Sequence, residues 1–146
     1  MVIVSLVHHA EAVESAVDPQ RPLSSRGQAQ AVWLAGQARE RQFRPVTIWH
    51  SGKLRSRQTA EEFLRQCNPF AAFRAVRGLL PGDPTMWMEN ALALESDDVL
   101  VVGHLPQLPQ LARVLGASDA LPLHGMLVLE RVETVRYVQR WMLAPP

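Results

Sequence analysis

Histidine is the most informative residue type in this chain, because four of its five copies follow short apolar runs typical of buried strands: His8, His9, His50 and His104. A neutral imidazole is a nucleophile near pH 7 and can attack phosphorus. A fixed arginine cation and a protonated imidazole would stabilise the charge that gathers on the phosphoryl oxygens in the transition state. His9, Arg55 and His104 are therefore the candidate core of a phosphoryl-transfer site that needs no metal.

Two other interpretations of these residues remain open at this stage. A histidine at a strand end is more often a surface or hydrogen-bonding residue, and Arg55 lies in a basic run with Lys53 and Arg57 that is typical of a solvated loop. A metal site built from the four histidines is the second interpretation. It is weaker, because no Asp or Glu lies at recognisable ligand spacing and adjacent strand residues diverge.

The elements that must position these side chains alternate along the chain. Short apolar runs predict three buried strands, over Val2–Val7, Val46–Trp49 and Asp98–Val102. Helix-start signals predict four helices: from a capping box at Ser25 and Gln28, over about Ser56–Gln66, from an N-cap at Asp83 with Pro84 to about Leu94, and from Pro106. Two final runs, Met126–Leu129 and Tyr137–Leu143, predict an antiparallel hairpin.

This order predicts a three-layer α/β/α sandwich with a mostly parallel, mixed sheet. The carboxyl ends of parallel strands meet at one edge, where ligands bind in such folds, so the strand-end histidines are expected to meet there. Helical spacing of apolar residues predicts the buried faces: Ala29, Val32, Trp33 and Gly36 in the first helix, Ala60, Phe63, Leu64 and Cys67 in the second, and Leu108, Leu111, Ala112 and Leu115 in the fourth.

Length and composition exclude several classes of protein. The chain has 146 residues, so we expect one domain over residues 1–146, and 47% hydrophobic residues exclude disorder as the main state. A net charge of +1 argues against a nucleic-acid partner, although every basic residue except Lys53 is arginine. The single cysteine, Cys67, excludes an internal disulfide and fits a reducing compartment. We expect a cytoplasmic monomer without a membrane span or signal peptide.

Four segments together resemble the histidine phosphatase (phosphoglycerate-mutase-like) superfamily. Leu6–Ala12 is similar to its Arg-His-Gly signature, and Ser51–Ala60 to a second motif with Ser, then Arg four residues later, then Gln-Thr-Ala. Val101–Pro106 is similar to the third motif. Arg21–Ser24, together with the later Gly27, resembles the small bacterial phosphohistidine phosphatases of the SixA-like branch. The match covers nearly the whole chain in the same order.

The resemblance implies roles for individual residues. His9 would be the nucleophile that becomes a phosphohistidine, and Arg55 and His104 would bind the phosphoryl oxygens, with His104 protonated. Three residues would bind the substrate or shape its loop: His8, Arg21 and Ser51. The resemblance implies no cofactor and no metal. The implied partner is a phosphorylated signalling protein or a small phosphate ester.

Two departures from the family pattern bear on activity. His8 stands where the family has arginine, so a permanent cation is replaced by an imidazole with an ordinary pKa of about 6.5. If His8 faces the phosphate, phosphate affinity should weaken as the pH rises through about 6–8. The mid-chain glutamic acid of larger members is also missing. Asp18 and Asp83 are the candidate acids, although Asp83 is also explained as a helix cap.

Three functions follow as alternatives. The first is a phosphatase acting on phosphohistidine, whose imidazole can leave protonated without a dedicated acid. The second is a degenerate member that binds phosphate or a phosphoprotein with little turnover, which the His8 substitution favours. The third is a phosphatase of small phosphomonoesters.

Overall fold

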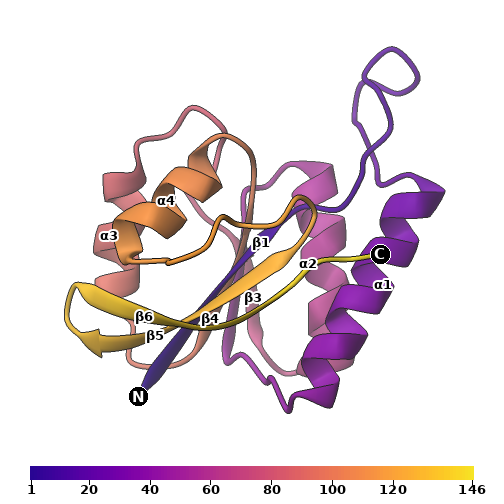
Figure 1. Ribbon diagram of the computed structural model, residues 1–146. Coiled ribbons are helices and arrows are strands. Elements are labelled where there is room, and N and C mark those ends of the chain that lie inside the picture. The colour runs from indigo at the N-terminus through magenta and orange to yellow at the C-terminus, as the bar shows by residue number, and fades with distance from the viewer.

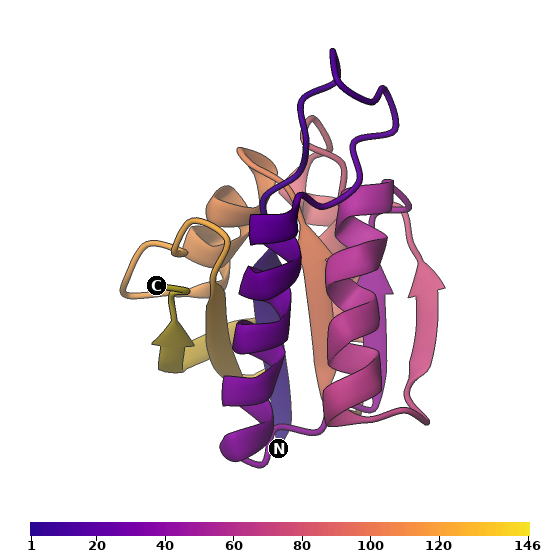
Figure 2. The same ribbon diagram turned by 90° about the vertical axis from the view of Figure 1, so that its right-hand side faces the viewer.

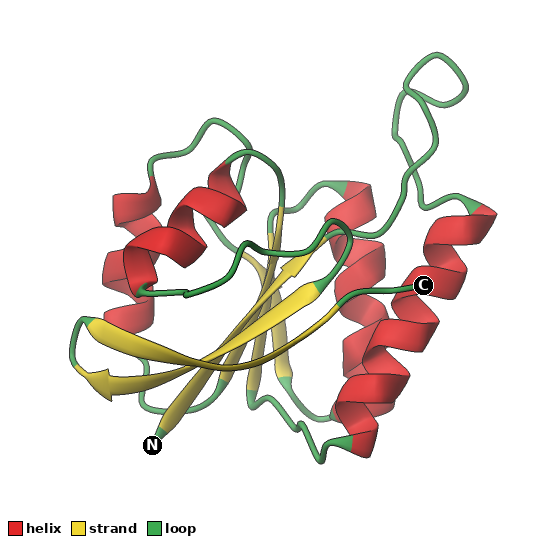
Figure 3. Ribbon diagram, viewed as in Figure 1, coloured by secondary structure: helices red, strands yellow, loops and turns green.

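The computed structural model describes residues 1–146 and consists of one six-stranded sheet between two pairs of helices (Figures 1 and 3). The strands are β1 (Val2–His8), β2 (Thr47–His50), β3 (Ala72–Ala75), β4 (Val99–Gly103), β5 (Met126–Glu133) and β6 (Arg136–Leu143). The helices are α1 (Ser25–Glu40), α2 (Leu54–Cys67), α3 (Thr85–Ala93) and α4 (Gln107–Leu115). The three-layer α/β/α architecture is the predicted one.

The sheet has the strand order β3-β2-β4-β1-β5-β6 and is mixed. The first four of these strands are parallel, whereas β5 runs antiparallel to β1, and β6 antiparallel to β5. His8 pairs with Gly103 and His50 pairs with Val102, so β1, β2 and β4 end at one level of the sheet. The parallel strands bring their following residues to a common edge, as the sequence predicted.

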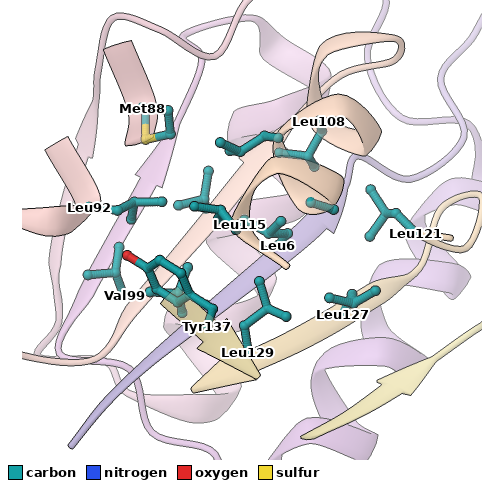
Figure 4. Packing of buried hydrophobic residues seen from close by; sticks show 14 of the residues in the cluster. Leu6, Met88, Leu92, Val99, Leu108, Leu115, Leu121, Leu127, Leu129 and Tyr137 are labelled. Atoms are coloured by element: carbon teal, nitrogen blue, oxygen red, sulfur yellow. The ribbon is translucent and has the colours of Figure 1, made fainter. Parts of the chain in front are cut away.

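Alternation along the strands divides the core between the two faces of the sheet. Val99 and Val101 point toward α3 and α4, and Leu100 and Val102 point toward α1 and α2. Figure 4 shows the first of these clusters, with Met88 and Leu92 of α3 and Leu108 and Leu115 of α4 around the strand residues. All four residues predicted as the buried face of α4 are buried: Leu108, Leu111, Ala112 and Leu115.

The other face of the sheet carries α1 and α2 and corrects one prediction. In α2 the predicted residues Ala60, Phe63 and Cys67 are buried. In α1, however, Ala29 and Val32 are exposed, and the opposite face is buried instead: Gly27, Gln30, Ala31, Leu34, Ala35 and Ala38. Small residues on this face let α1 approach the sheet and α2 closely. The prediction from apolar spacing had relied on the larger side chains of Val32 and Trp33.

Two helix starts also differ from the sequence analysis. The N-cap of α1 is Ser24, not Ser25, because the Ser24 hydroxyl accepts the Gly27 N–H at 3.0 Å. The residue before α3 is Pro84, and Asp83 accepts the Leu80 N–H at 2.9 Å within the preceding turn instead of capping the helix. Neither shift moves a helix relative to the sheet.

The sheet edges show one missed and one confirmed element. β3 was not predicted, since it has only four residues, Phe73 is its one partly buried side chain, and it pairs on one side only. The hairpin of β5 and β6 is confirmed, with antiparallel pairing from Met126–Leu143 to Glu133–Arg136. No helix is long and apolar enough to cross a membrane.

The connection from β1 to α1 projects well beyond the carboxyl edge of the sheet (Figure 2). Its two limbs are joined at the base, where Ala12 and Leu23 form an isolated antiparallel bridge and the Val13 N–H donates to the Pro22 carbonyl at 2.9 Å. This loop carries Arg21, so the fold places a basic side chain above the strand ends.

Candidate active site

The site begins with two strand ends that are joined by hydrogen bonds. The His9 N–H donates to the Gly103 carbonyl at 3.1 Å, which fixes the end of β1 beside the end of β4. The imidazoles of His9 and His104 consequently lie with ring centroids 5.0 Å apart and planes tilted by 57°. Both side chains are buried, with 8% and 1% of their surface exposed. The sequence prediction that these two histidines meet is confirmed.

His9 is held in one tautomer. Its Nδ1 lies 2.7 Å from the Ala10 carbonyl oxygen, which can only accept, so Nδ1 carries the hydrogen. In the neutral ring the lone pair is then on Nε2, and Nε2 has no partner within the protein. Burial lowers the pKa of His9 to about 4, although the bond to Ala10 acts in the opposite direction. His9 is thus a neutral imidazole with its nucleophilic nitrogen free.

His104 is fixed by Ser51, which follows β2. The Ser51 hydroxyl lies 2.6 Å from His104 Nε2 and also accepts the Lys53 N–H at 3.2 Å. His104 Nδ1 is buried without a partner. Burial, followed by the nearby His9 and Arg55, lowers the pKa of His104 to about 3. In the free site His104 is therefore neutral, and the protonated form implied by the family resemblance requires an added negative charge.

Arg55 and Arg21 bring positive charge to the histidines from two other segments. Arg55 lies in the first turn of α2, and its Nε is buried without a hydrogen-bond partner. Arg21, at a positive φ of 51°, donates from Nε to the Val13 carbonyl at 2.9 Å, which directs its guanidinium. After burial, which is the largest cause, the charges of Arg55 and Arg21 also lower the pKa of His9 and of His104. A groove of about 390 Å³ borders Arg55 and is lined by Pro19, Gln20, Gly52, Lys53, Leu54, Arg55 and Arg57.

The residues between the basic side chains tie the segments together. Thr59 accepts the Ala10 N–H at 3.0 Å and donates to the Arg55 carbonyl at 2.9 Å, so one hydroxyl joins the residue after His9 to α2. Gln58 accepts the Leu23 N–H at 2.8 Å and holds the base of the projecting loop. In this chain, Gln58 and Thr59 therefore join the projecting loop and the end of β1 to α2.

His124 belongs to the site and was missed by the sequence analysis. Its backbone N–H donates to His8 Nδ1 at 2.8 Å, and its own Nδ1 lies 2.8 Å from the His9 carbonyl oxygen. Its ring stacks on His8, with centroids 4.8 Å apart and planes 11° from parallel. The residue precedes β5, and the start of an antiparallel strand lies at the same edge as the ends of parallel ones. That rule points to His124 only once the antiparallel pairing of β5 with β1 is known, and the sequence did not predict this pairing.

His8 is buried and its pKa is lowered. It is 3% exposed, and burial, followed by the neighbouring His9, His124 and His104, lowers its pKa to about 3. Its Nδ1 already accepts a hydrogen bond, so protonation there would break a contact. The lowered pKa means that His8 does not lose a charge between about pH 6 and 8 in the free protein, whereas the weakening of phosphate affinity over that range stays a prediction. His8 is a neutral side chain in the free protein.

Three other candidates lie outside this cluster of rings. His50 accepts the Gly52 N–H at 3.1 Å, and its ring lies 5.0 Å from that of Phe73 on the edge strand. Asp18 accepts the Gln20 N–H in the projecting loop, and Asp83 accepts the Leu80 N–H before α3. Both carboxylates thus bond within their own loops. No group of three or more His, Cys, Asp or Glu side chains has an arrangement that could hold a metal ion.

Comparison with known proteins decides the family. The profile of the histidine phosphatase superfamily (branch 1) matches residues 5–79, which is about half of the chain and includes His8, His9, Arg21, Ser51 and Arg55. The chain belongs to the histidine phosphatase superfamily. No curated protein sequence matches it significantly.

Solved structures of histidine phosphatases share the fold over nearly the full length. The protein histidine phosphatase SixA complexed with tungstate has a TM-score of 0.88 at 22% identity, covering 98% of this chain and 97% of that one. A protein assigned as the phosphohistidine phosphatase SixA of Agrobacterium tumefaciens has a TM-score of 0.83 at 25% identity, with the same coverage. Phosphoglycerate mutase from Plasmodium falciparum has a TM-score of 0.69 at 18% identity, covering 96% and 89%. The tungstate complex of SixA and the phosphoglycerate mutase are only 22% and 18% identical to this chain, so their similarity concerns the fold alone.

Proposed function

We propose that the protein is a metal-independent phosphatase that forms a covalent phosphohistidine on His9 and dephosphorylates phosphohistidine in a signalling protein. The observation that carries this proposal is the state of His9: a neutral ring, with Nδ1–H donated to Ala10 and an unpartnered Nε2, beside two arginines. A nucleophile needs this lone pair, and a phosphoryl group needs the adjacent cations.

The proposed reaction has two steps. His9 Nε2 attacks phosphorus as the bond from phosphorus to the leaving imidazole nitrogen breaks. The electron pair of that bond stays on the leaving nitrogen, and the substrate imidazole, already protonated at its other nitrogen, departs as a neutral ring. Water then attacks the phosphohistidine, releasing inorganic phosphate and neutral His9. Arg55 and Arg21 stabilise the equatorial oxygens in both transition states, and Ser51 positions the neighbouring loop. The dianion raises the pKa of His104 by opposite-charge interaction, which lets His104 take up a proton and donate to a phosphoryl oxygen.

Two observations favour a phosphohistidine in a protein as the substrate. The groove beside Arg55 has exposed walls at Gly52, Lys53 and Arg57, which suits a phosphorylated side chain on a protein surface. Neither Asp18 nor Asp83 bonds outside its own loop, and an imidazole that departs as a neutral ring needs no such acid. A phosphate ester, whose alkoxide leaves less readily, gains more from an acid.

The test compares a phosphorylated histidine phosphotransfer protein with a sugar phosphate, both in the presence of a chelator. We expect a burst of dephosphorylation equal to the enzyme concentration, and an acid-labile, alkali-stable phosphate on a peptide containing His9. Faster turnover of the sugar phosphate would favour a small-molecule phosphomonoesterase. Phosphate binding without a burst on either substrate would favour the degenerate member that holds phosphate or a phosphoprotein.

A further inference from the structure

His8 and His124 form a paired unit that the superfamily signature does not account for. The two residues are 116 positions apart, yet they share a 2.8 Å hydrogen bond and a ring stack. His124 also contacts the His9 carbonyl, so it touches both residues at the end of β1. A third bond, from the His8 N–H to the Gly125 carbonyl at 3.0 Å, fixes the same two segments together.

The direction of the 2.8 Å bond determines the tautomer of His8. The donor is a backbone N–H, which can only donate, so His8 Nδ1 must accept and the ring hydrogen must be on Nε2. His8 Nε2 forms no hydrogen bond within the protein and retains some access to solvent. The ring of His8 lies 4.5 Å from that of His9. His8 thus presents a free, uncharged N–H donor next to the nucleophile.

The backbone conformation of His124 directs its two contacts with the end of β1. Its φ of 54° lies in the left-handed region, which few residues with a Cβ adopt. The turn that contains it is closed by the Gly125 N–H donating to the Pro122 carbonyl at 2.9 Å. In this conformation the N–H points at His8 while the side chain reaches the His9 carbonyl.

We propose that His124 is a positioning residue of the phosphatase site, which locks His8 as a neutral Nε2–H donor to the phosphoryl group and holds the His9 peptide in place. This proposal rests on the proposed function, since it needs a phosphoryl group bound at His9. His8 Nδ1 is occupied by the His124 N–H, whereas His104 Nδ1 has no partner, so a bound phosphoryl group protonates His104 and not His8. His8 then contributes a hydrogen bond in place of the charge that an arginine supplies.

The groups that face His8 all disfavour a charge on it. They come from each element packed against the end of β1: His9 on the strand itself, His104 after β4, His124 before β5, and Arg55 on α2. None of these is acidic. Because burial and these neighbours lower the pKa of His8 to about 3, the tautomer lock acts over the whole range in which imidazoles ordinarily titrate.

Nitrogen NMR of the imidazoles tests the lock in the resting protein, with His50 as an internal control because its Nδ1 also accepts a backbone N–H. From pH 5.5 to 8.5 we expect His8 to keep an acceptor-type Nδ1 and a protonated Nε2. Inorganic phosphate should shift the Nε2–H signal of His8 and leave that of His50 unchanged. A hydrogen on Nδ1, a titration within this range, or no response to phosphate would overturn the proposal.

Kinetics of three variants test the consequence for turnover. His124→Gly keeps the backbone N–H and suits the positive φ, but it removes the imidazole, so we expect kcat to fall about tenfold with KM little changed. His124→Asn, which tolerates this φ and retains a side-chain N–H, should recover part of that loss. His8→Leu should lower kcat/KM at least tenfold further than His8→Gln, whose amide restores a neutral donor.

A wild-type kcat in His124→Gly, or equal losses in His8→Leu and His8→Gln, would overturn the positioning role. Circular dichroism and thermal unfolding establish that each variant folds. The tautomer measurement needs no turnover, so its failure is distinct from a failure of the phosphoenzyme test.

Discussion

The site has a histidine half and an arginine half, and the two are built in opposite ways. The histidine half, His8, His9 and His104, lies at the ends of central strands and is almost fully buried. The arginine half, Arg21 and Arg55, lies on a projecting loop and at the start of a helix, where both residues are partly exposed. The difference follows from how each side chain responds to the loss of water.

An imidazole can shed its proton when it is buried, whereas a guanidinium cannot. Burial therefore yields neutral rings, which is the form that a nucleophile requires. The same burial would leave an arginine charged and poorly solvated, so the arginines remain at the boundary with water. The comparison indicates that the sheet supplies neutral imidazoles and that the surrounding segments supply positive charge.

Removing the imidazole of His9, the proposed nucleophile, is expected to have the largest effect on turnover. His9→Ala should abolish turnover and the covalent intermediate while the fold and the binding of inorganic phosphate at the arginine half persist. Phosphate release and calorimetric phosphate binding measure the two halves separately. His50→Asn, at the same sheet edge but outside the cluster, is the matched control and should keep wild-type turnover. Near-normal activity of His9→Ala on every substrate would refute the assignment.

Removing one cation should cost less than removing the nucleophile. Arg55→Ala should lower kcat/KM by about 10²–10³, equivalent to about 2.7–4 kcal/mol, by analogy with the loss of one oxyanion donor. Arg39→Ala, in the last turn of α1, should be nearly silent, because Arg39 is exposed and forms only a 3.9 Å ion pair with Glu40. If KM rises while kcat is unchanged, Arg55 binds substrate and transition state equally.

The histidine half should also be visible in the pH dependence of stability. Burial lowers the folded pKa of His8 from 6.5 to about 3, so the unfolded chain binds the extra proton between these values. The stabilisation is complete above about pH 6.5 and is lost as the pH falls toward 3, by up to about 1.4 kcal/mol per pH unit. Urea unfolding from pH 7 to 4 should show a shallower decline for His8→Gln than for the wild type. Parallel declines would show that His8 is not buried as a neutral ring.

The smallest effect on activity is predicted for Gly27, where α1 packs against the loop that carries Arg21. A Cβ on Gly27 would collide with the carbonyl oxygen of Glu11. Glu11 lies near the start of the loop that carries Arg21. Gly27→Ala should destabilise the protein by about 1–3 kcal/mol and weaken phosphate binding through the displaced loop. Gly82→Ala has open space around the added methyl group and should change stability by less than about 0.5 kcal/mol. Equal unfolding midpoints for the two variants would show that the loop tolerates the shift.

The sequence predicted most of the sheet and the meeting of His9 with His104, because buried parallel strands have a strong β-branched pattern. It failed where the pattern is weak or where the contact is distant. β3 is a short edge strand, and the buried face of α1 is defined by small residues. His124 depends on the antiparallel pairing of β5 with β1, which no local pattern reports. The neutral state of His8 follows from burial and from a backbone N–H, and neither can be read from residue types.

Under the proposed function, the register of β1 makes catalytic activity a measure of correct assembly. Val7 pairs with Met126 on one side and Val102 on the other, and the His9 N–H is bound by Gly103. A slip of one residue would exchange the two faces of the strand and turn the nucleophile away from His104 and the arginines. A molecule with a slipped β1 strand would therefore lack phosphatase activity. In a preparation of this protein, the fraction of molecules that form the covalent intermediate should equal the fraction with a correctly ordered sheet.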